Sequence, residues 1–122
     1  MPSPAPLRGE IWIVGTGNPP KRHWAVVVSL NGRNQNPRAD SVLVVPFGSK
    51  PAGGPSVIRF EPGETGLPGT SYLRADLIQV ALKERLHERL PRPLSNRRMK
   101  EVCIAIRRAF DPDALSDTLP IR

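Results

Sequence analysis

The stretch KRHWAVVVSL, residues 21–30, decides the fold class of this 122-residue chain. Four small apolar residues, three of them valine, directly follow Trp24. A short, β-branched run of this kind favours a buried strand over a helix. We therefore predict a strand over residues 24–30. Lys21, Arg22 and His23 precede it, so the strand begins beside side chains that can bind an anion.

Similar short apolar runs lie on both sides of this stretch, separated by some of the 15 prolines and 10 glycines of the chain. This much proline and glycine argues against long helices and for strands joined by turns. Further strands are predicted over residues 10–15, Ser41–Gly48 and 56–60. Residues 71–90 are ambiguous, because their leucine, isoleucine and alanine residues could also form one helical stripe.

The clearest helix lies near the C-terminus. Ser95 is a suitable N-cap, and apolar residues follow at helical spacing at Met99, Val102, Cys103, Ile106 and Phe110. Proline limits the helix at residue 112. The sequence thus predicts one mainly β domain over residues 1–122, closed by a C-terminal helix. Its core spans about residues 8–110, and residues 111–122 form a loosely ordered tail.

Charge and cysteine content restrict the function further. The chain carries 18 Lys and Arg against 11 Asp and Glu, a net charge of +7, which favours a nucleic acid or an acidic protein as partner over a merely soluble basic surface. Cys103 is the only cysteine, so an internal disulfide and a cysteine-based metal site are excluded. No apolar run approaches the ~20 residues of a membrane span, and the expected location is the cytoplasm.

Five segments, in order along the chain, resemble the MazF/PemK (Kid-like) toxins of type II toxin–antitoxin systems. They are RGEIW at residues 8–12, AVVVS at 25–29, VVPFGS at 44–49, GLPGTSYLRADLIQV at 66–80 and PLSNRRMKEV at 93–102. The resemblance implies an SH3-like barrel of the CcdB/MazF/PemK type and makes residues 71–80 a strand. It also implies a homodimer, an acidic antitoxin as partner, and sequence-specific cleavage of single-stranded mRNA that needs no metal or other cofactor and inhibits growth.

Arg74 and Asp76 are the first candidate catalytic residues. Residues two apart on a strand point to the same face, which would place this cation and carboxylate side by side. Cleavage by the RNA's own 2′-OH needs a base, an acid for the leaving 5′-oxygen and positive charge near the phosphorane. The resemblance implies these roles for the pair, because the PemK branch carries Arg-x-Asp at this place. The alternative is a surface ion pair worth about 0–1 kcal/mol.

His23 is the third candidate catalytic residue, since the loop before it carries an active-site histidine in the PemK branch. Histidine titrates near neutral pH and can donate to a phosphate. Many relatives have Arg-Pro where this chain has His23-Trp24, so either Arg22 or His23 takes over the arginine's role. The alternative for His23 is an ordinary residue at the start of a strand.

The expected substrate-binding residues are Lys21, Arg22, Trp24 and Ser49. Trp24 could stack on an unpaired base or belong to the core, whereas Trp12 and Cys103 are expected in the core and His87 on the surface. Most relatives have threonine at the position of Gly48, while Ser49 matches the family's serine. These departures leave open a non-catalytic, CcdB-like gyrase-binding toxin or a decayed nucleic-acid-binding homologue.

Overall fold

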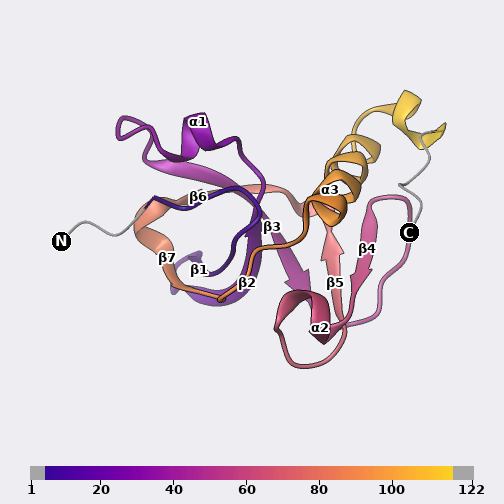
Figure 1. The fold of residues 1–122 in the computed structure, drawn as a ribbon, viewed down its shortest axis with the longest axis horizontal. Coiled ribbons are helices and arrows are strands. Elements are labelled where there is room, and N and C mark those ends of the chain that lie inside the picture. The colour runs from indigo at the N-terminus through magenta and orange to yellow at the C-terminus, as the bar shows by residue number, and fades with distance from the viewer. Residues whose placement is uncertain (1–4, 117–122) are drawn as a thin grey trace.

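A computed structural model describes residues 5–116 (Figure 1). Within this range the strands are β1 Ile11–Thr16, β2 Lys21–Val27, β3 Ser41–Gly48, β4 Val57–Phe60, β5 Ser71–Arg74, β6 Gln79–Leu82 and β7 Leu86–Arg89. The α-helices are α1 Asn31–Asn34, α2 Pro62–Thr65 and α3 Asn96–Arg108, and the 3-10 helices are η1 Ala75–Leu77, η2 Lys83–Arg85 and η3 Pro112–Ser116. The predicted mainly β fold with a C-terminal helix is confirmed.

The strands form one antiparallel sheet in the order β4-β5-β3-β2-β1-β7, with β6 also paired to β3. The long strand β3 joins the two parts of this sheet. Its first half pairs with β6, its middle with β2 and its last two residues with β5. Figure 1 shows β7 and β1 towards one end of the molecule and β4 and β5 towards the other, with α3 beside the latter.

Two hydrophobic cores lie on opposite faces of β2 and β3, as the alternation of side chains along a strand requires. The first core contains Val26, Val45 and Phe47 together with residues of α3 such as Met99 and Val102. The second contains the alternate residues of the same strands, which are Ala25, Val27, Val42 and Val44. The unbroken apolar run that predicted β2 is therefore explained by burial on both faces.

The structure differs from the predicted boundaries at both ends of β2. The strand begins at Lys21, three residues early, because its hairpin with β1 extends to the pair Thr16–Lys21. It ends at Val27, before the predicted residue 30, because the chain turns there towards α1. In that turn the Ser29 hydroxyl donates to Asn34 and accepts from the Leu43 N–H. The backbone of residues 28–30 therefore forms the connection to α1.

Three further predictions need correction. Residues 71–80 are not one strand, because η1 separates β5 from β6. The apolar stripe of α3 does not reach Phe110, which lies beyond the last helical residue and is 73% exposed. The tail expected to be loosely ordered begins with η3, whose Ala114 is fully buried; the prediction for residues 117–122 lies outside the described residues.

Trp12 and Cys103, expected in the core, are only partly buried. The Trp12 indole packs against the second core and donates through Nε1 to Oε1 of Glu10 at 3.1 Å. Cys103 Sγ accepts a hydrogen bond from Nη2 of Arg8 at 2.9 Å. Both side chains therefore link the N-terminal segment to the body of the domain.

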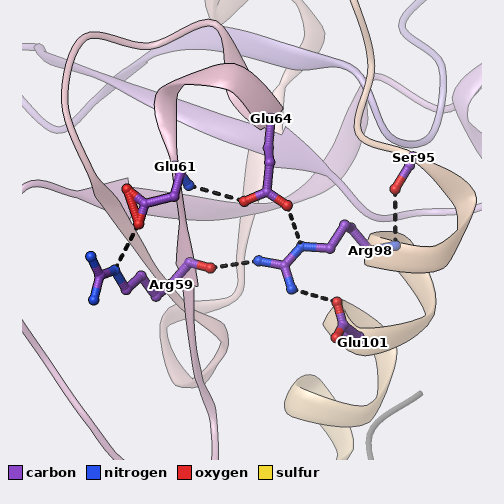
Figure 2. A network of polar contacts seen from close by, with 6 residues as sticks. All are labelled: Arg59, Glu61, Glu64, Ser95, Arg98 and Glu101. Atoms are coloured by element: carbon purple, nitrogen blue, oxygen red, sulfur yellow. Dashed lines mark hydrogen bonds and ion pairs between the residues drawn. The ribbon is translucent and has the colours of Figure 1, made fainter. Parts of the chain in front are cut away.

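A polar network holds α3 against α2 and β4 (Figure 2). The Ser95 hydroxyl caps α3 by accepting from the N–H of Arg98, as predicted. The Arg98 guanidinium pairs with Glu101 of the same helix and with Glu64 of α2, and it donates to the carbonyl of Arg59 on β4. It also lies over the Phe60 ring, 4.1 Å from the centroid, a favourable cation–π geometry. One buried cation thus orients three elements.

Candidate active site

A cavity of about 550 Å³ lies where β3 ends beside β5. Gly48 pairs with Tyr72 across these strands, and Ser49 and Lys50 continue from β3 into the loop that borders the cavity. Arg74, the last residue of β5, also lines it. The cavity therefore combines two cations, hydroxyl groups and an aromatic ring, which are groups suited to an RNA strand.

Arg74 and Asp76 form an ion pair, with Nη2 of the arginine 2.9 Å from Oδ2 of the aspartate. A second contact joins Nε to Oδ1 at 3.4 Å. The predicted contact is therefore present, but the predicted reason is wrong. Asp76 lies in η1 and not on a strand, and the 3-10 turn brings its carboxylate back to Arg74. Both side chains are over one-third exposed, so a substrate can reach them.

His23 lies on the same face of the sheet as the cavity but does not line it. It pairs with Val14 of β1, and continuing the register between β2 and β3 sets it opposite Gly48. Its backbone is then two strand spacings, about 10 Å, from that of Tyr72. Among the described residues its Nε2 atom is buried without a hydrogen-bond partner. Burial lowers the pKa of the imidazole below 6.5, so His23 is neutral at neutral pH.

The four residues that precede the apolar run of β2 divide between two faces. Lys21 and His23 share the face of Gly48, whereas Arg22 and Trp24 point to the opposite face, as alternation along a strand dictates. Trp24 packs against the first core and is half-buried. The structure thus brings Ser49 to the cavity of Arg74, sets Lys21 and His23 on the same face, and separates Arg22 and Trp24 from it.

A larger cavity of about 640 Å³ lies elsewhere, between the α1–β3 segment, β6 and η2. None of the predicted catalytic or substrate-binding residues lines it. Within residues 5–116, no helix has the length and apolarity of a transmembrane span. The same part of the chain does not bring three His, Cys, Asp or Glu side chains together as a metal site would require.

The model of a known family matches residues 7–110, nearly all of the chain; it is described as a PemK-like, MazF-like toxin of type II toxin–antitoxin system. The chain belongs to this PemK/MazF toxin family. The family predicted from the five segments is therefore confirmed. No curated protein sequence matches the chain.

Solved structures agree with this assignment. An endoribonuclease in complex with its cognate antitoxin, from a mycobacterial species, is 26% identical with a TM-score of 0.73, over 86% of this chain and 94% of its own. Another mycobacterial endoribonuclease is 24% identical with a TM-score of 0.71, over 87% of this chain and 91% of its own. A MazE–MazF structure from Deinococcus radiodurans is 19% identical with a TM-score of 0.70, over 86% and 95%. The last two similarities show the fold alone.

The structure of this PemK/MazF toxin explains how Gly48 fits the site. A Cβ atom at Gly48 would meet only the Tyr72 carbonyl oxygen, at 3.9 Å, and the residue does not have a positive φ. Neither backbone nor packing therefore requires glycine here, and the threonine of most relatives would fit. In this toxin Ser49, the residue directly after β3, lines the cavity and supplies a hydroxyl group there.

Tyr72 and Lys50 line the cavity but were not among the predicted catalytic and substrate-binding residues. Tyr72 precedes Arg74 by two positions on β5, so alternation along the strand sets both side chains on one face. That spacing could have indicated the tyrosine from the sequence. Lys50 lies in an irregular loop, where no periodicity predicts the direction of a side chain.

Proposed function

We propose that this toxin is an endoribonuclease that cleaves single-stranded mRNA without a metal ion and thereby inhibits growth. The observation that carries the proposal is the exposed Arg74–Asp76 ion pair, whose arginine lines a basic cavity, in a chain of the PemK/MazF toxin family. A structural neighbour that is 26% identical and described as an endoribonuclease supports it.

In the proposed reaction the 2′-OH of the RNA attacks the adjacent phosphorus, and the P–O5′ bond breaks to leave a 2′,3′-cyclic phosphate. The Asp76 carboxylate accepts the proton of the attacking hydroxyl. Arg74 stabilises the charge of the phosphorane, because a guanidinium does not release its proton near neutral pH. An N–H of neutral His23 donates a hydrogen bond to the phosphate. The leaving 5′-oxygen takes its proton from solvent water, because neither a neutral imidazole nor a guanidinium releases a proton near neutral pH. The Ser49 hydroxyl and the Lys21 ammonium bind the phosphates on either side.

The proposed protein partner is an acidic antitoxin segment. The net charge of +7 favours such a ligand, and the structural neighbour that is 26% identical is an endoribonuclease in complex with its cognate antitoxin. Because both ligands are anionic, the antitoxin segment and RNA should compete for the basic cavity. The proposed site of action is the cytoplasm, where mRNA is available.

We also propose that the toxin forms a homodimer through β6 and η1. Leu77, Val80 and Leu82 are 46%, 60% and 39% exposed, an unusual concentration of apolar surface for six consecutive residues. Within residues 5–116, β6 pairs only with β3, so its other edge is free to meet a second copy.

The experiment that tests the activity is incubation of the purified toxin, free of antitoxin, with a long unstructured RNA in excess EDTA. We expect discrete cuts that share a short sequence, with cyclic phosphate at the new 3′ ends. Mapping both ends of each fragment gives the specificity at the same time. Intact RNA from folded protein would overturn the proposal and favour a non-catalytic, CcdB-like toxin, for which co-purification with DNA gyrase is the next assay.

A further inference from the structure

A β-bulge at His87 places its imidazole over the backbone of Gly15. Val14 pairs with Leu86, but Ile13 pairs with Glu88, so His87 is the extra residue of β7. A Cβ atom at Gly15 would lie only 3.2 Å from Nε2 of His87. A side chain at position 15 would therefore require the ring to shift by a few tenths of an ångström. Bulges of this kind commonly redirect a side chain towards a functional site.

Two arginines lie around the same glycine. The Cδ atom of Arg85, from η2, would be 3.9 Å from the same Cβ position. Arg22 of β2 is paired with Gly15, and paired residues direct their side chains to one face of the sheet. Three donor side chains from three elements therefore converge on one backbone position.

The part of the chain that the structure describes holds no partner for these three side chains. Within residues 5–116, the side chains of Arg22, Arg85 and His87 make no hydrogen bond or ion pair with another group, whereas Arg59, Arg74, Arg89, Arg98 and Arg107 are all paired with carboxylates. Glu88, the acidic residue of β7, pairs with Ile13 and therefore shares the face of Gly15. The two arginines outnumber this carboxylate, so the cluster keeps a net positive charge.

We propose that Arg22, Arg85 and His87 form a second contact site for the phosphate backbone of single-stranded RNA, outside the cavity of Arg74. Unpaired guanidinium groups suit phosphate, because their several N–H donors match its oxygens. The imidazole adds a further donor. The inference rests on the proposed function, since it takes RNA as the ligand.

The position of this second site predicts which RNA molecules use it. Arg22 and His23 are neighbours on β2 but point to opposite faces. A strand held at Arg74 and His23 must therefore pass around the β1–β2 hairpin before it meets Arg22, Arg85 and His87. A short RNA that fills the cavity cannot do this. The second site should strengthen binding of long RNA only.

The test measures binding of two fluorescein-labelled, 2′-O-methyl RNA pools of random sequence, about 4 and about 12 nucleotides long, a range typical of single-strand sites. The 2′-O-methyl group removes the attacking hydroxyl, so the probes stay intact. Arg85→Gln and His87→Gln should each weaken binding of the long pool about three- to fivefold and leave the short pool unchanged. For Arg85→Gln the slope of log Kd against log salt should fall by about 0.7.

Two further variants make the test specific. Arg97→Gln is the matched control, because Arg97 is also exposed and without a side-chain partner among residues 5–116 but lies on α3, away from β7 (Figure 1). It should change neither Kd. Gly15→Ala should weaken binding of the long pool less than His87→Gln does, since the added methyl group requires the imidazole to shift by only a few tenths of an ångström.

The inference is overturned if the Arg85 and His87 variants bind the long pool as wild type does, if both pools weaken equally, or if Arg97→Gln has the same effect. It is also overturned if wild-type protein binds neither pool. Binding of both pools by a protein that does not cut unmodified RNA would overturn the proposed nuclease activity alone and leave the second contact site standing.

Discussion

Arg98 and Glu101 form an ion pair of 2.6 Å within α3, with side chains that are 8% and 0% exposed. Neither charge is available to a ligand, so the pair is structural. Its arginine also reaches Glu64 and the carbonyl of Arg59 (Figure 2). A buried ion pair adds little to stability compared with apolar residues of the same shape. Loss of one partner is nevertheless destabilising, because it leaves a buried charge without an opposite charge beside it.

Glu101→Gln should therefore lower the free energy of unfolding by about 3 kcal/mol, measured by urea denaturation. Arg59→Gln is the control, because its ion pair with Glu61 is exposed and should contribute less than about 1 kcal/mol. The double variant Arg98→Met with Glu101→Leu should recover much of the loss. Equal stability of Glu101→Gln and wild type would show that the network does not hold α3 in place.

Asp76→Asn should abolish RNA cleavage, with a fall in kcat of at least about 100-fold, because the amide cannot accept the proton of the 2′-OH. Stability should change by less than about 1 kcal/mol, since the pair with Arg74 is exposed. Asp111→Asn, which alters a similarly exposed carboxylate paired with Arg107, is the control and should keep full activity. Cleavage by Asp76→Asn at the wild-type rate would exclude the aspartate as base.

His23→Gln should make stability less dependent on pH below about pH 6.5. Burial lowers the pKa of this imidazole in the folded protein, so the unfolded chain takes up a proton at a higher pH than the folded one. The contribution of neutral His23 to the free energy of unfolding is thus complete at a pH above the pKa that the imidazole has in the unfolded chain. It is lost as the pH falls through the lower pKa that the imidazole has in the folded protein.

Urea denaturation at several pH values between about 7 and 5 measures this difference. The wild-type protein should lose stability more steeply than His23→Gln as the pH falls. Lys21→Gln is the control, because it removes a charge from the same face without removing an imidazole. Identical pH profiles for wild type and His23→Gln would contradict the assigned burial of the ring.

Gly48→Thr should raise kcat several-fold at unchanged stability, because it adds a hydroxyl donor at the cavity that can stabilise the charge of the transition state. The position has room for a side chain. Gly48→Val tests whether the hydroxyl is responsible, since valine has the same shape without a donor. A rise in both variants would assign the effect to packing.

Val80→Asp should dissociate the proposed homodimer. The side chain is 60% exposed on β6, so the change costs the monomer little, whereas a carboxylate at an apolar interface lacks a partner. Sedimentation velocity at several concentrations measures the change. Leu30→Asp is the control. Leu30 is also exposed, but it directly precedes α1 and does not belong to β6 or η1, so this variant should leave the dimer intact. A wild-type protein that is monomeric at all concentrations would refute the dimer.

The sequence predicted features that depend on near neighbours in the chain. The strand Ser41–Gly48 has the predicted bounds, and Ser95 caps α3, because β-branched runs and capping residues act within a few positions. The contact of Arg74 with Asp76 was also predicted, since side chains only two positions apart in the chain lie close together. The order of five short segments was sufficient to predict the toxin family.

Tertiary structure alone decided which residues meet across strands. The position of His23 opposite Gly48 follows from the register of β2 and β3, and His87 lies over Gly15 because of a bulge that no local pattern indicates. The burial of Glu101 likewise depends on α2 and β4 packing against α3. Pairing and packing bring together residues that are distant in the chain, so local propensities could not determine these contacts.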